Sequence, residues 1–228
     1  MNPTLQKQPA YDVAVGQVTR NKVLRNTFWL LALSMIPTVL GAFIGVSMQL
    51  PMLSGGMGFV IFLVVAFGFM FAIEKTKESA LGVFMLLGFT FFMGLMLTPL
   101  LRHTLGYSNG GTLIMTAFGG TACVLAVMAS IATTTKRDFS GMGSWLMAGV
   151  IVLLLAGVAN IFLQLPALTI VFSVLAMAIF SAFILYDVQR IVNGGETNYI
   201  SATLAIYLDV YNVFTSLLRL LGIVGGDD

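Results

Sequence analysis

The sequence predicts an all-α integral membrane protein built from seven transmembrane helices. Of its 228 residues, 58% are hydrophobic and only 9% are charged, and the mean hydropathy is +0.99. A soluble domain carries about 25% charged residues, so this composition indicates a chain that crosses the membrane several times. The net charge of +2 and the lack of a basic patch with interleaved aromatic residues argue against a nucleic-acid partner. The single cysteine, Cys123, lies in an apolar stretch and is predicted to be a small buried residue.

Seven hydrophobic segments are each long enough to cross about 30 Å of hydrocarbon at about 1.5 Å per residue. In chain order they cover residues 27–49, 57–73, 80–101, 111–133, 142–163, 167–192 and 200–223. Residues that break helices or carry charge separate them, in the order Leu50–Gly56, Glu74–Glu78, Asn109–Gly111, Lys136–Asp138, Gln164–Pro166 and Asn193–Gly195. A six-span alternative, with the last and least hydrophobic segment re-entrant, stays open.

These spans divide the chain into three parts. Residues 1–26 are polar, contain two prolines and scattered charge, and are predicted to be a disordered cytoplasmic tail. Residues 27–223 form the membrane domain, and residues 224–228 form a short exterior tail. No apolar core followed by a cleavage site precedes the first span, so we expect that span to act as the targeting signal.

Basic residues predict the orientation of the spans. With a cytoplasmic amino terminus, the loops and tail on the inside hold nine basic residues, and the outside loops hold only Arg102. The nine are Lys7, Arg20, Lys22, Arg25, Lys75, Lys77, Lys136, Arg137 and Arg190. Because cytoplasmic loops are enriched in Lys and Arg, this asymmetry predicts that the amino terminus is cytoplasmic.

Two acidic residues, Asp187 and Asp209, lie inside the last two spans. An ionised carboxylate in hydrocarbon costs several kcal/mol, so such residues usually line a water path, pair with another group or have a function. If the two spans form a hairpin that turns near Glu196, Asp187 lies nine residues before the turn and Asp209 thirteen after it. Their depths then differ by about 6 Å, and helix tilt can bring the two carboxyl groups together.

The last span carries a polar face. Asp209, Asn212, Ser216 and Arg219 recur at a spacing that places them within about 80° around the helix. A membrane helix with such a face belongs against other helices or a water-filled cavity rather than against lipid. We therefore expect residues 200–223 to form the central helix of the bundle.

Two carboxyl groups within hydrogen-bonding reach cannot both ionise at low cost, so one proton is shared between them. After that proton is lost, the two negative charges repel, and the helices separate or recruit a cation. Calcium accepts carboxylate and carbonyl oxygens in flexible geometry, which makes Asp187 and Asp209 a possible calcium site for a permeating ion. No resident cofactor is expected.

A purely structural role is the alternative for both residues. Asp187 then neutralises Arg190 one turn later, and Asp209 hydrogen-bonds a neighbouring helix, for example through Asn160. These alternatives and the shared proton are both open at this point.

Seven stretches of the chain resemble the Bax inhibitor family, and most closely its bacterial YccA-like branch. They are Lys22–Thr27, Thr134–Ser140, Met147–Gly149, Val158–Pro166, Tyr186–Gln189, Gly194–Ile200 and Leu208–Phe214. The resemblance covers positions 22 to 222. It implies two three-helix layers around a central carboxy-terminal helix, and a location in the bacterial inner membrane. It also implies a pH-sensitive calcium leak governed by a di-aspartyl pair, here Asp187 and Asp209.

Three functions follow as hypotheses. The first is a calcium-permeable leak channel gated by protons at Asp187 and Asp209. The second, implied by the YccA-like branch, is a regulatory partner of a membrane-anchored AAA protease that engages residues 1–26. The third and most remote is an intramembrane aspartyl protease, although such enzymes place Gly-x-Gly where this chain has Ile206-Tyr207-Leu208. The sequence has no phosphate loop, zinc motif, nucleophile elbow or Cys/His pair, and we expect no enzymatic activity.

Overall fold

The computed structural model describes residues 8–48, 55–163 and 165–226, and these form helices joined by short connections. The helices are α1 (Gln8–Met48), α2 (Gly55–Thr76), α3 (Ala80–Met96), α4 (Thr98–Leu105), α5 (Gly110–Thr134), α6 (Met142–Leu163), α7 (Pro166–Val192) and α8 (Tyr199–Gly225). Within the described ranges there is no β-strand. Seven helical spans are long and apolar enough to cross a membrane, with α3 and α4 together forming one of them. The predicted all-α, seven-span membrane fold is therefore confirmed.

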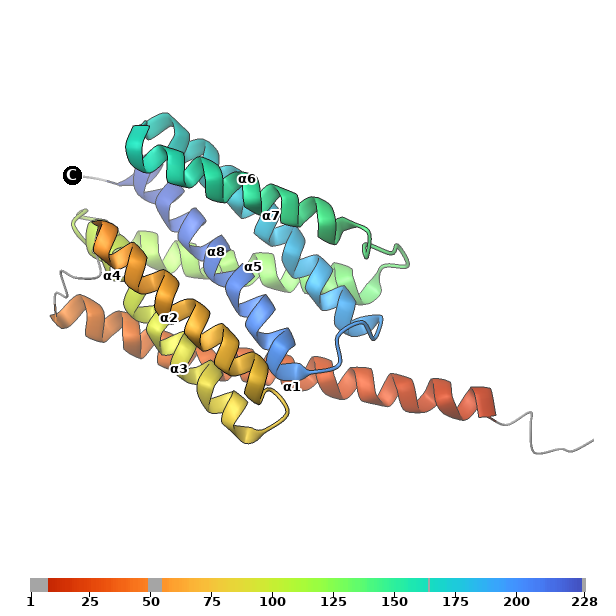
Figure 1. The fold of residues 1–228 in the computed structure, drawn as a ribbon. Helices are drawn as coiled ribbons and strands as arrows, with labels where there is room; N and C mark the ends of the chain where they lie inside the picture. Colours follow the sequence, from red (N-terminus) through yellow and green to blue (C-terminus); the bar gives the residue numbers. More distant parts are fainter. Residues whose placement is uncertain (1–7, 49–54, 164, 227–228) are drawn as a thin grey trace, which may run out of the picture.

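Helix α8 lies at the centre of the bundle. It contacts α1, α2, α3 and α4 on one side and α5 and α7 on the other, and Figure 1 shows it running diagonally between these two groups. Helix α6 is peripheral and packs against α7. Ten residues of α8 are buried, among them Ile206, Tyr207 and Leu218. The polar face predicted for the last span therefore belongs to a central helix, as expected.

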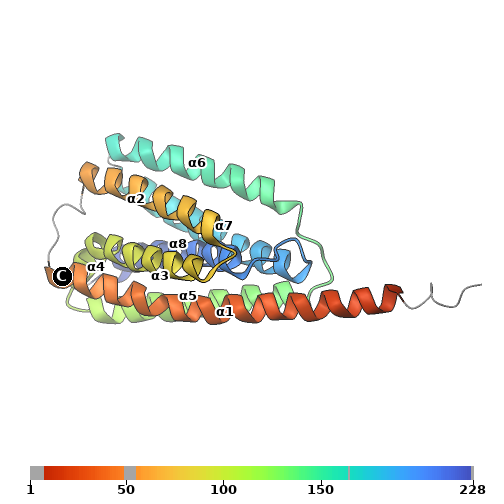
Figure 2. The same ribbon diagram turned by 60° about the horizontal axis from the view of Figure 1, so that its bottom comes forward.

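The amino-terminal part of the chain differs from the prediction. Helix α1 begins at Gln8, so residues 8–26 are helical rather than disordered, while residues 1–7 lie outside the described ranges. This segment projects beyond the other helices in Figures 1 and 2. Pro9 stands in the first turn, where proline is tolerated, and the next proline is Pro37. Extending an existing helix avoids the cost of nucleation, which explains why a polar segment continues the first span.

The carboxyl end of the chain also differs slightly from the expected tail of residues 224–228. Helix α8 continues to Gly225, so the first two residues of that tail are helical. The amide of Asn109 donates to the Gly225 carbonyl at 2.6 Å, which ties this end to the start of α5. Residues 227–228 lie outside the described ranges.

Helices α1 and α3 approach each other closely enough that their backbones touch. A Cβ atom added at Gly94 would collide with the backbone carbonyl oxygen of Thr38, and one added at Gly41 would collide with the carbonyl of Phe91. Small residues at a helix crossing allow this close van der Waals packing. Such packing stabilises helix association in lipid, where the hydrophobic effect does not drive it.

Three connections meet at one end of the bundle, together with helix α1. The side chain of Asn198 before α8 donates to the Lys77 carbonyl after α2 at 2.9 Å. Gln189 on α7 donates to the Arg137 carbonyl at 2.7 Å, and Arg20 on α1 donates to the Val192 carbonyl at 3.5 Å. The basic residues counted above that the structure describes therefore gather at this end.

Large apolar side chains cover the outside of the bundle. Trp29, Phe43 and Trp145 are 74%, 69% and 82% exposed, which suits residues that face lipid. Cys123 on α5 is also exposed, so the prediction of a buried cysteine was wrong. Because lipid rather than water surrounds the helices, apolar residues occur on their outer faces as well as in the core. An apolar stretch therefore shows that a segment lies in the membrane, but not which of its residues are buried.

Candidate functional site

The two intramembrane aspartates are brought together by α7 and α8, which pack along each other after a tight turn. Gly194 supplies the turn with a positive φ of 78°, a conformation that favours glycine. The side chain of Asn198 then caps α8 by accepting from the backbone N–H groups of Ile200 and Ser201 at 2.9 and 3.1 Å. This geometry sets the relative register of the two helices and hence the meeting of Asp187 with Asp209.

The carboxyl groups of Asp187 and Asp209 lie within hydrogen-bonding reach of one another. The Asp187 side chain is 12% exposed, and Asp209 is 5% exposed. The second carboxyl oxygen of Asp209, Oδ2, has no hydrogen-bond partner among the described residues. Because an ionised carboxylate can only accept, a hydrogen bond between the two groups requires a proton on one of them. The site can therefore hold a shared proton.

Arg190 lies beside this pair, toward the end of the bundle that holds the basic residues. Its guanidinium is 3.6 Å from Asp187 Oδ1 and 3.7 Å from Glu196 Oε2, and its side chain is 39% exposed. Its charge lies 5.8 Å from the centre of the Tyr186 ring. Half-exposed ion pairs of this length contribute little to stability. Asp187 thus contacts Arg190, as the structural alternative predicted, and also lies beside Asp209.

Asn160 does not reach Asp209, and the suggested hydrogen bond between them was wrong. Its amide donates to Thr169 Oγ1 at 3.3 Å and its carbonyl accepts from the Leu165 N–H at 3.0 Å. Asn160 lies three residues before the end of α6, whereas Asp209 lies in the middle of α8. The residue therefore holds the connection between α6 and α7.

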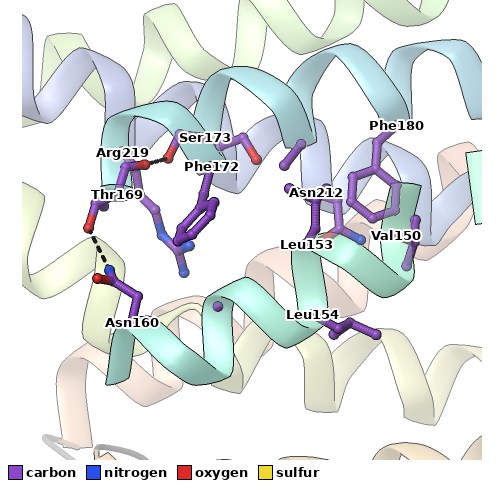
Figure 3. Close-up of a pocket in the computed structure, with 13 residues that line it drawn as sticks. Val150, Leu153, Leu154, Asn160, Thr169, Phe172, Ser173, Phe180, Asn212 and Arg219 are labelled. Carbon is purple, nitrogen blue, oxygen red and sulfur yellow. Dashed lines mark hydrogen bonds between the residues drawn. The ribbon is translucent and has the colours of Figure 1, made fainter. Parts of the chain in front are cut away.

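The remaining residues of the polar face line a cavity of about 330 Å³ between α6, α7 and α8. Asn212, Ser216 and Arg219 all contribute to it, together with Asn160 from α6 (Figure 3). Neither Asp187 nor Asp209 belongs to its lining. The helical spacing predicted one polar face, and the structure divides that face between the carboxyl pair and this separate cavity.

One buried polar cluster was not expected from the sequence. The Tyr207 hydroxyl lies 2.9 Å from Thr38 Oγ1 and donates to the Thr90 carbonyl at 3.4 Å, which links α8 to α1 and α3. Tyr207 is 1% exposed and stands two residues before Asp209. The signal for this cluster in the sequence was a tyrosine two residues before an intramembrane acid. Its partners on α1 and α3 are hydroxyl and backbone groups, which no spacing rule identifies.

A family model and several known proteins match this chain over nearly its whole length. The family model described as "Inhibitor of apoptosis-promoting Bax1" matches residues 20–226. The "Modulator of FtsH protease YccA" of Escherichia coli K12 is 40% identical over 210 residues, which cover 92% of this chain and 94% of that protein. An uncharacterized protein of Pseudomonas aeruginosa is 40% identical over 206 residues, covering 90% and 91% of the two chains.

Further relatives extend this agreement. An uncharacterized protein of Neisseria meningitidis serogroup B is 35% identical over 222 residues, covering 96% and 98% of the two chains. In a second Escherichia coli strain, the relative that is 40% identical over 210 residues is named "Inner membrane protein YccA". The seven-helix fold, the family match from residue 20 to residue 226 and these near full-length similarities lead to one conclusion: this chain belongs to the Bax inhibitor family.

Proposed function

We propose that this protein modulates a membrane-anchored AAA protease of the FtsH type. The observation that carries the proposal is its 40% identity, over 92% of its length, to a protein named as a modulator of that protease. Neither that name nor the family description is the name of an enzyme. A regulatory role in membrane protein quality control is therefore favoured over a catalytic one.

The projecting start of α1 is the element that we assign to the protease partner. Residues 18–22 are exposed, and Lys22 and Arg25 carry positive charge at the end of the bundle assigned to the cytoplasm. Arg20 marks the boundary of the segment, because it is the residue whose side chain contacts the turn between α7 and α8. Residues 1–17 precede this contact along the chain, so a partner that engages them need not break it.

Deleting residues 2–17 tests this assignment while leaving the Arg20 contact in place. In cells that overproduce the protein, we expect the truncated form to lose its effect on the degradation of the protease's other membrane substrates. A matched variant carries a glycine and serine segment of the same length, which separates loss of sequence from loss of length. The proposal fails if the truncated protein accumulates normally and affects degradation as the full chain does.

A second candidate function is a pH-sensitive cation leak, and one specific observation favours it. Two carboxyl groups, from Asp187 and Asp209, lie within hydrogen-bonding reach inside the membrane domain. With a shared proton they join α7 to α8, and without it two negative charges repel in a poorly solvated interior. Separation of these helices would open a path for a cation. The pair supplies fewer oxygens than the about six to eight that calcium takes, so water or carbonyl groups complete its shell during passage.

Calcium flux into liposomes that contain the purified protein tests this second function. We expect flux to depend on pH in the wild type and to lose that dependence when Asp187→Asn and Asp209→Asn are combined. Asp138→Asn, which removes an acid from the exposed loop before α6, is the matched control and should leave the pH dependence intact. An unchanged pH profile in the double variant would exclude the carboxyl pair as the gate.

A further inference from the structure

We propose that the cavity between α6, α7 and α8 binds an anionic phospholipid of the outer leaflet, with its phosphate held by Arg219. The cavity, about 330 Å³, lies within the range of roughly 300–1,000 Å³ typical of small-molecule sites. It is separate from the carboxyl pair, and the proposal does not depend on either function proposed above.

Arg219 is a charged side chain without a counter-charge in the part of the chain that the structure describes. It is exposed and points into the cavity beside the ring of Phe172 (Figure 3). Among the described residues its guanidinium forms no hydrogen bond or ion pair. A guanidinium at membrane depth is costly without an anion, and its planar donors match phosphate in a two-point contact.

Polar groups beside Arg219 add donors for the same ligand. Ser216 is 5% exposed and lines the cavity, and its hydroxyl forms no hydrogen bond with any described residue. Thr169 accepts from Asn160 at 3.3 Å, which leaves its own O–H free to donate. Asn160 uses one N–H of its amide in that bond and retains the other. The polar end of the cavity is therefore rich in donors, as an anion site requires.

Apolar side chains make up the rest of the cavity, which distinguishes a lipid from a soluble anion. Phe180 and Val150 lie at the end away from Asn160 in Figure 3, and Leu153 and Leu154 line the α6 wall. No described side chain of α6 is buried, so this helix separates the cavity from lipid on the outside of the bundle. A phospholipid fills both ends, because its phosphate meets Arg219 and its acyl chain meets the apolar lining.

The depth of Arg219 matches the position of a phosphate. It lies six residues before Gly225, the last residue of α8, or about 9 Å along the helix. This end of the bundle is opposite the basic connections, so the site faces the outer leaflet. The long arginine side chain can reach toward the headgroup region from this depth.

Retention of phosphatidylglycerol by the purified full-length protein tests the proposal. We compare the wild type with Arg219→Gln and with Arg102→Gln, an exposed arginine on α4 that does not line the cavity. After delipidation and addition of phosphatidylglycerol, native mass spectrometry measures the bound lipid. We expect about a tenfold weaker binding in Arg219→Gln, the size of one lost charge-assisted contact, and no change in Arg102→Gln. Equal losses in the two variants, or no loss in Arg219→Gln, would overturn the proposal.

A second pair of variants tests the acyl-chain part of the cavity and does not remove a charge. Gly157 lines the cavity and an added Cβ meets no atom, so Gly157→Leu should fill the space and reduce lipid retention. Gly119→Leu on α5, also in open space but outside the cavity, should retain the lipid. Inorganic phosphate is the final probe: competition by phosphate alone at the concentration of the lipid would assign the site to a soluble anion and refute the lipid proposal.

Discussion

The side-chain amide of Asn198 donates to the backbone carbonyl of Lys77 at 2.9 Å, which joins the turn before α8 to the turn after α2. The same amide donates to Glu78 at 3.0 Å, and its oxygen caps the first turn of α8. One residue thus connects the central helix to the layer that contains α2 and α3. The connection lies beside the turn that sets the register of Asp187 and Asp209.

Asn198→Ala should destabilise the protein by about 1 kcal/mol, because it removes a helix cap and two contacts between layers. Asn193→Ala is the matched control. That residue is exposed, and its side chain forms no hydrogen bond with the described residues, so its replacement should change stability little. Unfolding in mixed micelles with increasing denaturing detergent measures both. Equal stability of the two variants would show that the Asn198 contacts contribute nothing.

Tyr207→Phe should cost about 1 kcal/mol, since it removes the buried hydroxyl that links α8 to Thr38 on α1 and to Thr90 on α3. Tyr211→Phe, one turn later on α8, removes a hydroxyl that forms no hydrogen bond with the described residues and should be milder. The same detergent titration compares them. A larger effect of Tyr211→Phe would contradict the role given to the Tyr207 cluster.

The sequence predicts the membrane spans well, and the reason lies in the physics of the bilayer. Each span end lies within four residues of its predicted position except at the start of α1. Lipid demands a continuous apolar helix, so hydropathy identifies spans well. Hydropathy did not predict the start of α1, because residues 8–26 are polar. Their helical structure depends only on the continuation of an existing helix.

The sequence predicted the site only to the extent that helical spacing and span geometry determine which residues share a face or a depth. Helical spacing correctly grouped Asn212, Ser216 and Arg219, and the hairpin geometry correctly placed Asp187 near Asp209. The spacing of one helix says nothing about which neighbour it meets, so Asn160 was assigned to the wrong partner. The roles of these residues in gating or ion binding stay predictions.

Gly94→Ala should destabilise the protein by about 1–3 kcal/mol, because the added methyl group meets the backbone of Thr38 and that backbone cannot move aside. Gly68→Ala on α2 makes the same chemical change in open space and should be neutral or stabilise the helix by up to about 1 kcal/mol. Detergent unfolding again measures both. Similar effects of the two substitutions would mean that α1 and α3 do not cross as closely as described.

Acid should loosen the connection between α5 and α6. The pKa of Asp138 lies below its ordinary value because the carboxylate accepts from the Ser140 backbone N–H at 2.9 Å. A lowered pKa means that the stabilising contact is present above the unfolded pKa and is lost as the pH falls through the folded value. Protection of the Ser140 amide from hydrogen exchange should therefore fall below about pH 4. Asp138→Asn keeps an acceptor but cannot titrate, so its protection should not change over that range; a parallel fall would refute the assignment.

The orientation inferred from charge can be tested with two glycines at opposite ends of the bundle. Gly141 follows the basic loop before α6, and Gly111 is the second residue of α5 at the other end. An added Cβ meets no atom at either position. Both substitutions to cysteine are made with Cys123→Ser, because Cys123 is itself exposed. With a cytoplasmic amino terminus, a membrane-impermeant maleimide should label Gly111→Cys in intact cells and Gly141→Cys only after lysis. The reverse labelling pattern would show that the protein has the opposite orientation in the membrane. The start of α1 would then lie outside the cell, where a protease acting in the cytoplasm could not reach it.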